Sequence, residues 1–528
     1  MEKRALIAVA LAFAVLLIYQ FIFIKPEPQK IPQPQQAAEE KQAREEAKVT
    51  PPPLVVEKKP APSTEKEIKV ETALYSAVIS SRGASITHFE LKGYKDKSGK
   101  NVILLKETGL KPSLGIGASD DFELADLAYT VSAKEIALDQ KTPSGSLVFE
   151  HAGAGFSVRR SFTFHNDTYK IDVKDEVSGL GDYWITIGAD FGVHDAADTW
   201  MHSGPVLLQE TNRLEFDPKK LSESKVFSGG LKWIAQEDKY FFASLVPVTP
   251  VEEARVWKIK DTPIIAFRGK PGVNSFILYA GPKEYDTLKA LNVGLEHIVD
   301  FGFFSIIALP LFWILKLFYN LSGNYGWAIV CLTTLVRIPF IPLVNKSQKS
   351  MKKMQDIQPK MAEVREKYKK DPQRMQREMM GLYKTHKVNP LGGCLPMLLQ
   401  IPVFFALYKI LMIAIELRGA PFMLWIKDLS APDTLFGHIP SLFPLIGGFA
   451  VGPLPILMGA TMLIQQKMTP TSLDPTQNKI MMLMPIIFTF MFLNFASGLV
   501  LYWLMNNVFS IAQQFYVNQK LAKEKAKE

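Results

Sequence analysis

The chain has 528 residues, of which 48% are hydrophobic and 21% are charged, and it carries a formal net charge of +9. This length exceeds one ordinary domain of roughly 100–200 residues. Apolar residues are concentrated in residues 1–24 and after Asp300, which excludes a purely soluble protein. The two cysteines, Cys331 and Cys394, belong to no CxxC or Cys/His cluster. We therefore expect no disulfide framework, no metal site and no cofactor.

The amino-terminal segment predicts a membrane anchor followed by a tether. Residues 5–24 are uncharged and long enough to cross a hydrocarbon core of about 30 Å. Bulky residues such as Tyr19 and Phe21 near the end of this stretch argue against a cleavable signal peptide. We interpret residues 1–24 as an uncleaved transmembrane anchor. Residues 25–67 are rich in Pro, Gln, Ala, Glu and Lys and predict a disordered linker.

Residues 68–285 predict an all-β sandwich domain. Short runs with alternating apolar and polar residues, such as 156–164 and 169–173, are separated by Gly, Asp, Asn and Pro turns. His194, Asp198 and His202 follow an i, i+4, i+8 spacing that metal sites use, but the surrounding turn-rich sequence favours surface residues. The chain contains no GxSxG, HExxH or phosphate-loop motif, so we predict no enzymatic reaction.

After Asp300 the sequence predicts one interfacial helix and five transmembrane spans. The segment 300–322 contains Pro310 and Lys316 and suits an amphipathic helix in the outer interface. The run from 480 to 519 is too long for one crossing and should reverse near residues 494–498. The predicted spans are about 324–345, 392–416, 445–467, 480–496 and 498–516. With the anchor they give a bundle of six transmembrane helices.

The topology follows from one basic segment. Residues 345–391 carry 13 Lys and Arg against 5 Asp and Glu, which is +8 of the chain's +9. The positive-inside rule places this segment, a predicted helical hairpin at 346–390, in the cytoplasm. Two helices, at about 348–369 and 372–386, should form this hairpin, and Asp371 and Pro372 are a suitable N-cap and first residue for the second. Both termini, including the basic tail 517–528, are then cytoplasmic, and the β domain lies outside.

Arg337 is the most informative residue of the bundle. It interrupts an apolar run about nine residues before Lys346, and a charge at that depth must face protein, water or an anionic partner. Snorkelling to the headgroups is the simpler alternative. Thr333 lies one turn earlier on the same face, and Gln400 could add an amide. Further amides from the last span could come from Asn506, Asn507, Gln513 and Gln514. Together they predict a polar inner half of the bundle, although such residues often only join helices.

The hairpin is dense in methionine and lysine. Flexible thioether side chains suit varied apolar partners, but they could equally seal the core of the hairpin itself. Contact with ribosomal RNA or anionic headgroups is expected for so basic a surface. The candidate contact residues are Met351, Met354, Lys352, Lys353, Met379 and Met380.

Three motifs resemble those of a known family. Residues 376–404 read QREMMGLYKTHKVNPLGGCLPMLLQIPVF, residues 324–328 read NYGWA, and residues 497–503 read SGLVLYW. These stretches closely resemble the YidC membrane-protein insertase family, of the type with a large periplasmic domain. The resemblance covers the whole organisation and is strongest from about Asp300 onward.

The resemblance implies a bacterial inner-membrane insertase and chaperone that inserts nascent membrane proteins, alone and together with the Sec translocon. It implies a hydrophilic cationic groove, open to cytoplasm and lipid, that contains Arg337. Family substrate contacts map to Thr333, Tyr502 and Trp503, and Gln400 fits a groove-lining position; the family often has tyrosine where this chain has Trp503. The implied partners are nascent membrane proteins, the Sec translocon, the ribosome and signal recognition particle system, and the lipid bilayer, without DNA. The periplasmic β domain resembles a sugar-mutarotase fold, which does not imply sugar chemistry.

Two rival functions are compatible with the residues alone. A small-anion transporter could use Arg337 as its binding site, although no internal repeat is evident in the spans. A membrane-tethered carbohydrate-binding protein would instead use the β domain as its working part.

Overall fold

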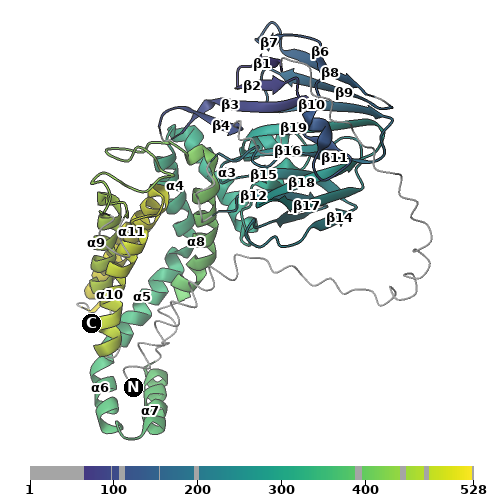
Figure 1. Cartoon of the computed structure of the whole chain (residues 1–528). Coiled ribbons are helices and arrows are strands. Elements are labelled where there is room, and N and C mark those ends of the chain that lie inside the picture. The colour runs from purple at the N-terminus through teal and green to yellow at the C-terminus, as the bar shows by residue number, and fades with distance from the viewer. Residues whose placement is uncertain are drawn as a thin grey trace, which may run out of the picture. The chain divides into compact units, whose positions relative to one another are not determined.

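The computed structural model describes residues 65–96, 98–105, 113–153, 155–194, 201–386, 395–440, 448–468 and 475–525. These residues divide into two compact units at Val299 and Asp300, a β-rich unit and a helical unit (Figure 1). The predicted anchor 1–24 and nearly all of the predicted linker 25–67 lie outside the described residues.

Among its described residues, the β-rich unit contains three sheets. The first has the order β4-β3-β2-β1-β7: β4 Asn101–Leu105, β3 Ser85–Lys95, β2 Tyr75–Ser80, β1 Glu67–Glu71 and β7 Glu135–Ala137. The second has the order β13-β12-β15-β16-β19-β10-β9-β8-β6. Its strands are β13 Asn212–Glu215, β12 Gly204–Gln209, β15 Leu231–Glu237, β16 Phe241–Pro247, β19 Gly272–Pro282, β10 Lys170–Ser178, β9 Ser157–His165, β8 Ser144–Ala152 and β6 Thr130–Val131. The third has the order β14-β17-β18-β11-β5, with β14 Lys225–Ser228, β17 Glu253–Ile259, β18 Thr262–Gly269, β11 Tyr183–Thr186 and β5 Ile116–Gly117. Short helices η1 (Glu123–Asp126), α2 (Tyr285–Ala290) and η2 (Leu295–Ile298) complete the unit.

Alternation along the strands fills the core of the β-rich unit. In β9 the inward residues Val158, Phe162 and Phe164 are buried, whereas their neighbours face outward. Each strand of the β8–β9–β10 meander pairs antiparallel with the next, so the inward rows lie in register. The period-2 pattern read from residues 156–164 therefore positions a buried aromatic layer.

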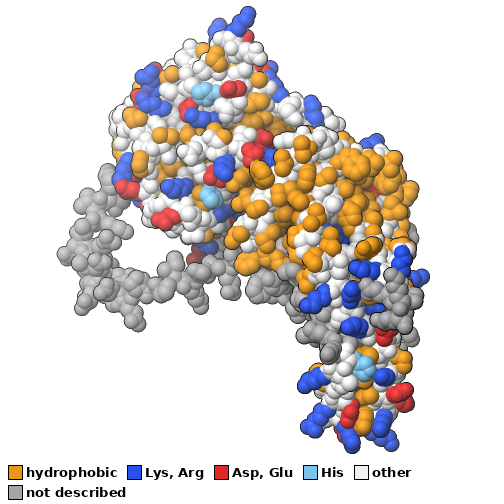
Figure 2. Space-filling view, turned by 180° about the vertical axis from the view of Figure 1, so that it is seen from behind, with side chains coloured by type: hydrophobic (Ala, Val, Ile, Leu, Met, Phe, Trp, Pro, Cys, Tyr) orange, Lys and Arg blue, Asp and Glu red, His pale blue; other side chains and the backbone are white. Residues whose placement is uncertain are grey.

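The helical unit is built mainly from nine α-helices among its described residues. They are α3 Ser305–Ser322, α4 Tyr325–Arg337, α5 Ile341–Asp356, α6 Gln358–Lys367, α7 Pro372–Thr385, α8 Leu395–Ile413, α9 Pro453–Met468, α10 Pro475–Phe492 and α11 Ser497–Lys525, of which α6 and α7 form the hairpin. The single turns η3 (Ile338–Phe340) and η5 (Ile415–Leu417) follow α4 and α8. Figure 2 shows hydrophobic side chains gathered over this unit and Lys and Arg side chains around its hairpin end.

Helix lengths test the predicted spans. Two described helices are long and apolar enough to cross a membrane, Ser305–Ser322 and Tyr325–Asp356, and shorter apolar helices occupy Gln400–Ile413 and Met481–Phe492. Among the described residues, length and composition thus give two such helices and not the predicted count of six.

Two predicted boundaries differ from the structure. The span predicted at 324–345 continues as helix to Asp356, because Arg337 and Ile341 on either side of η3 keep right-handed helical dihedral angles. The last helix also extends beyond the predicted span 498–516: α11 runs to Lys525, since the tail is composed mainly of the good helix formers Lys, Ala, Gln and Glu. The predicted tail 517–528 is therefore helical as far as it is described.

The hairpin forms with one interruption. Asp371 accepts a hydrogen bond from the Arg374 backbone N–H at 3.1 Å, so the predicted N-cap of α7 is confirmed. The first arm was predicted as one helix from about 348 to 369, but it breaks at Ile357. Pro359 lies in the first turn of α6, where its missing N–H and rigid ring favour a new helix start.

Candidate functional site

Arg337 is bound to the last helix by neutral acceptors. Its Nη1 donates to the backbone oxygen of Asn506 and, at 2.8 Å, to the Asn506 side-chain oxygen. Its Nη2 donates to the Ser510 hydroxyl at 2.9 Å, and that hydroxyl donates to the Asn506 carbonyl at 2.8 Å. These contacts join the end of α4 to the middle of α11. Among the residues that the structure describes, no acidic side chain pairs with the guanidinium, so its positive charge is not cancelled by them.

A small cavity lies beside the guanidinium. Its volume is about 30 Å³, enough for roughly two water molecules. The lining residues come from α4, η3, α5, α8 and α11: Thr333, Val336, Arg337, Phe340, Val344, Gln400, Tyr502 and Asn506. Four residues predicted from separate stretches of sequence, Arg337, Thr333, Gln400 and Tyr502, therefore share one cavity.

The polar groups of this cavity differ in whether they already form hydrogen bonds within the protein. The Thr333 hydroxyl donates to the Ile329 carbonyl at 2.7 Å within α4, and Thr333 is 1% exposed. Tyr502 is buried and lines the cavity together with Gln400. Thr333 thus contributes mainly shape to the wall, whereas Tyr502, Gln400 and Arg337 form its polar lining.

Trp503 lies outside the cavity. Its ring packs against Phe404 at 5.0 Å, Phe492 at 5.2 Å and Phe488 at 5.8 Å between ring centroids. Adjacent residues on a helix point about 100° apart, so Trp503 points in a different direction from Tyr502. The structure places Trp503 in an aromatic cluster of α8, α10 and α11.

Other polar residues of α11 join it to neighbouring helices. Asn507 donates to the Thr461 hydroxyl at 3.1 Å, and Gln513 donates to the Asn345 side-chain oxygen at 2.8 Å. Gln514 donates to the Met468 carbonyl at 2.6 Å. Asn507, Gln513 and Gln514, suggested from sequence as groove amides, therefore act as helix connections, and only Asn506 of that group reaches the cavity.

Sequence reasoning missed part of the site. Ser510, which holds Arg337, is indistinguishable in the sequence from any other serine in an apolar helix. Its position four residues after Asn506, on the same helix face, is the signal that could have found it. Val336, Phe340 and Val344 were also not identified, because apolar wall residues carry no chemical signature.

The methionines of the hairpin divide between core and surface. Met354, Ile357 and Met361 are buried, and Met379, Leu382 and Tyr383 pack against them. Met354 and Met379 therefore seal the hairpin. Met380 is 48% exposed and Lys353 is exposed, whereas Met351 and Lys352 are partly buried. Only Met380 and Lys353 of the six candidates are fully presented to a partner.

The two histidines of the i, i+4, i+8 set, His194 and His202, make backbone contacts. His194 Nδ1 lies 3.2 Å from the Ile103 oxygen, and His202 Nε2 lies 3.1 Å from the Pro205 oxygen. Asp198 lies outside the described residues. Across the described part of the chain no group of three or more His, Cys, Asp or Glu could hold a metal ion. The preferred interpretation as surface and turn residues agrees with these contacts.

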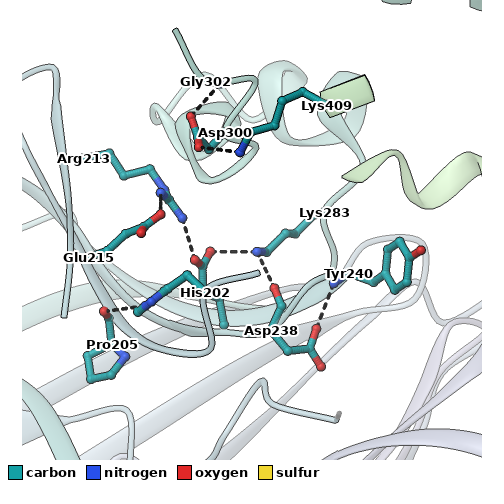
Figure 3. Close-up of polar contacts among 11 residues, drawn as sticks. His202, Pro205, Arg213, Glu215, Asp238, Tyr240, Lys283, Asp300, Gly302 and Lys409 are labelled. Atoms are coloured by element: carbon teal, nitrogen blue, oxygen red, sulfur yellow. Dashed lines mark hydrogen bonds and ion pairs between the residues drawn. The ribbon is translucent and has the colours of Figure 1, made fainter. Parts of the chain in front are cut away.

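A buried ion-pair network lies near His202. Glu237, which is 1% exposed, accepts from Arg213 Nη2 at 2.5 Å and pairs with Lys283 Nζ at 2.7 Å (Figure 3). Lys283 also donates to the Asp238 carbonyl. The carboxylate is thus shared between two cations that are themselves engaged, an arrangement typical of a structural network.

Comparison with known proteins places the chain in a class and then in a family. Residues 317–525 match the family described as 60Kd inner membrane protein, and residues 67–314 match the family described as YidC periplasmic domain. The chain is therefore a membrane protein with a helical membrane part and a periplasmic β-rich domain. Membrane protein insertase YidC of Pelobacter propionicus is 40% identical over 98% of this chain and 99% of its own length. The protein of the same name from Citrifermentans bemidjiense is 40% identical over 99% of this chain and 100% of its own length. The chain belongs to the YidC membrane protein insertase family.

Solved structures show weaker likenesses. A crystal structure of an active YidC insertase with the first transmembrane domain resolved is 19% identical, with 86% of this chain and 93% of that chain covered and a TM-score of 0.39. A putative mutarotase, YeaD from Salmonella typhimurium, is 10% identical over 40% of this chain and 90% of its own, with a TM-score of 0.27. The full-length relatives are named insertases and not enzymes, and they give no support to the small-anion transporter.

Proposed function

We propose that this chain inserts and folds nascent inner-membrane proteins through a hydrophilic cationic groove formed around Arg337. The observation that carries the proposal is a guanidinium held only by neutral acceptors, among the described residues, beside a cavity that can hold water. The relatives that match over their full length are named membrane protein insertases.

The physics of this arrangement suits acidic hydrophilic segments. Moving a carboxylate from water into a low-dielectric interior costs several kcal/mol unless it is paired or solvated. An uncompensated cation lowers that cost by Coulomb attraction, which strengthens as the effective dielectric falls. The apolar segment of the client then gains roughly 25 cal/mol per Å² on entering lipid. No covalent step is required.

The proposed topology has six transmembrane helices with both termini in the cytoplasm of a bacterial cell. Its support is the charge of the hairpin segment, +8 of the chain's +9 between residues 345 and 391. In this topology the groove opens to the cytoplasm and to lipid, and α3 lies in the outer interface. The exposed apolar side chains of α3, including Ile306 at 86% and Trp313 at 66%, suit that position.

The proposed cytoplasmic partners are the ribosome and the signal recognition particle system. The exposed Lys353 and Met380 of the hairpin offer one basic and one apolar contact. Cooperation with the Sec translocon belongs to the same proposal. Its support is the resemblance of the motifs around residues 324–328 and 376–404.

The test is insertion of a short client with an acidic outer tail into vesicles that contain the purified chain. Arg337→Ala should abolish insertion and Arg337→Lys should retain it, because the lysine preserves the charge. Gln513→Ala is the matched control, since it removes a contact between α11 and α5 without changing charge. Normal insertion by Arg337→Ala would show that the positive charge is not the working element.

A further inference from the structure

The loop between α8 and α9 is fastened to the ends of two other helices. The Asn324 side chain, which caps α4, donates to the carbonyl of Pro421 at 3.1 Å and to that of Phe422 at 3.2 Å. The Ser497 backbone N–H, at the start of α11, donates to the Ala431 carbonyl at 2.8 Å. The loop is therefore held in place at the end of the bundle where α4 and α11 begin.

A close approach to α4 fixes the base of the loop's most exposed turn. A Cβ added to Gly326 would lie 2.0 Å from the Phe422 ring, so only glycine allows the ring to lie there. The Phe422 ring also meets the Trp327 ring edge-on at 5.5 Å. The Phe422 N–H donates to the Ile426 carbonyl at 3.0 Å, and the Ile426 N–H donates to the Met423 carbonyl at 3.2 Å, which closes the turn.

Leu424, at the tip of this turn, has an unusual backbone conformation and an unusually exposed side chain. Its φ is 56°, in the left-handed region that favours glycine and asparagine and is strained for a branched apolar residue. It is also 83% exposed, the highest exposure of any large hydrophobic residue after Phe303 and Ile306 among the described residues. Asparagine or glycine would relieve both the strain and the contact with water. A leucine here requires a partner that favours an apolar side chain.

The surface next to the turn identifies that partner. Exposed apolar side chains run along one face of α4 and its continuation: Trp327 at 46%, Leu335 at 40%, Ile338 at 54% and Ile341 at 43%. This helix is long and apolar enough to cross the membrane, so its exposed apolar face meets lipid. The turn lies beyond the first residue of that face, against Trp327, and Met423 beside Leu424 is 43% exposed.

The charges flanking the turn fit a membrane interface. Residues 419–426 are uncharged, and the basic residues Arg418 and Lys427 lie on either side of them. Lysine and arginine beside an apolar segment place their heads among lipid phosphates, and tryptophan favours the same depth. The segment 418–427 therefore has the composition of an interfacial anchor in a position that continues a lipid-facing helix.

We propose that the Met423–Leu424 turn is immersed in the interface of the bilayer leaflet in which α4 begins, with phospholipid acyl chains around Leu424. The turn anchors the loop between α8 and α9 in the membrane as well as to the helix ends. This anchor is independent of the insertion activity proposed above, since it requires only that the chain resides in a bilayer.

The test uses the full chain with Cys331→Ser and Cys394→Ser, reconstituted in vesicles of phosphatidylethanolamine and phosphatidylglycerol. A nitroxide is attached at Leu424→Cys or, as the matched control three residues later, at the exposed Lys427→Cys. Power saturation measures the access of oxygen, which enriches in lipid, and of a water-soluble nickel complex. We expect an oxygen-to-nickel access ratio several-fold higher at position 424 than at 427.

Two results would overturn the proposal. Equal ratios at the two positions would place Leu424 no deeper than Lys427 and therefore outside the acyl chains. Low access of both reagents at position 424 would mean that protein covers it, either a second copy of the chain or another partner. Met423→Cys provides an independent label on the same turn and should give the same ratio as Leu424→Cys.

Discussion

Two arginines, the buried Arg160 of the β-rich unit and the partly buried Arg337 of the helical unit, show opposite solutions to the same electrostatic problem. Arg160 in the β-rich unit is 0% exposed and forms a bidentate pair with Asp175, Nε to Oδ1 at 2.7 Å and Nη2 to Oδ2 at 2.9 Å. Asp175 is also 0% exposed. Arg337 in the helical unit is bound instead by the neutral oxygens of Asn506 and Ser510. One charge is cancelled and the other is preserved.

The difference separates a structural cation from the cation that we propose to be functional. Burial alone would lower the pKa of Arg160, but the Asp175 carboxylate beside it raises that pKa, so the pair stays ionised within the core. Such a pair exerts little field at a distance because the two charges offset each other. The Arg337 guanidinium faces a cavity and keeps its field, which is what recognition of an anionic segment requires.

The largest expected effect comes from breaking the structural pair. Arg160→Met leaves Asp175 buried and unpaired, which should cost about 3–5 kcal/mol of the free energy of unfolding of the β-rich unit. Thermal unfolding of the full chain in detergent, followed by the β-sheet circular dichroism signal, measures the change. The double variant Arg160→Met with Asp175→Leu should recover most of the loss, since it removes both charges. An unchanged unfolding temperature in the single variant would contradict the structural role.

The second-largest effect is expected from a variant that places a carboxylate beside Arg337, as Asp175 lies beside Arg160. Asn506→Asp keeps the shape of the side chain but supplies a carboxylate to the guanidinium, so it should cancel the field in the cavity. Insertion of a client with an acidic tail should fall roughly tenfold, equivalent to about 1.4 kcal/mol, whereas a client with a neutral tail should be much less affected. The difference between the two clients distinguishes loss of charge from loss of folding.

The matched control for this comparison is Gln513→Glu. It adds the same charge to the same helix two turns further along, where the side chain faces Asn345 and not Arg337. If this variant reduced acidic-tail insertion as much as Asn506→Asp, the effect would reflect the general charge of α11 and not the charge held beside Arg337.

Local signals in the sequence predicted helices and strands better than they predicted contacts between residues far apart in the chain. The alternation of residues 156–164 predicted β9, and the Asp371–Pro372 pair predicted the start of α7, because both depend on neighbours in the chain. The break at Ile357 was missed, although Pro359 nearby offered a signal.

The sequence identified the candidate cation but not the residues that bind it. A cation at an apolar depth is visible in a sequence, so Arg337 was identified from its own surroundings. The acceptors that hold it lie 169 and 173 residues away, at Asn506 and Ser510, and no local pattern links them to Arg337. Trp503 failed to reach the cavity for a related reason: a motif gives residue identity, but the helix phase relative to α4 is set by packing.

The smallest expected effect concerns a half-buried carboxylate with two cations, an intermediate case between Arg160 and Arg337. Burial raises the pKa of Glu71, but hydrogen bonds from Lys69, Lys92 and Ser76 outweigh it and lower the pKa from 4.5 to about 2. Because the folded-state pKa is depressed, the unfolded chain binds the proton more readily. The stabilisation is therefore complete above about pH 4.5 and is lost as the pH falls toward 2. Glu71→Gln should reduce the unfolding free energy at pH 7 by about 1 kcal/mol or less. Its difference from the wild type should shrink on acidification through that window, whereas a difference that stayed constant with pH would assign the effect to packing and not to charge.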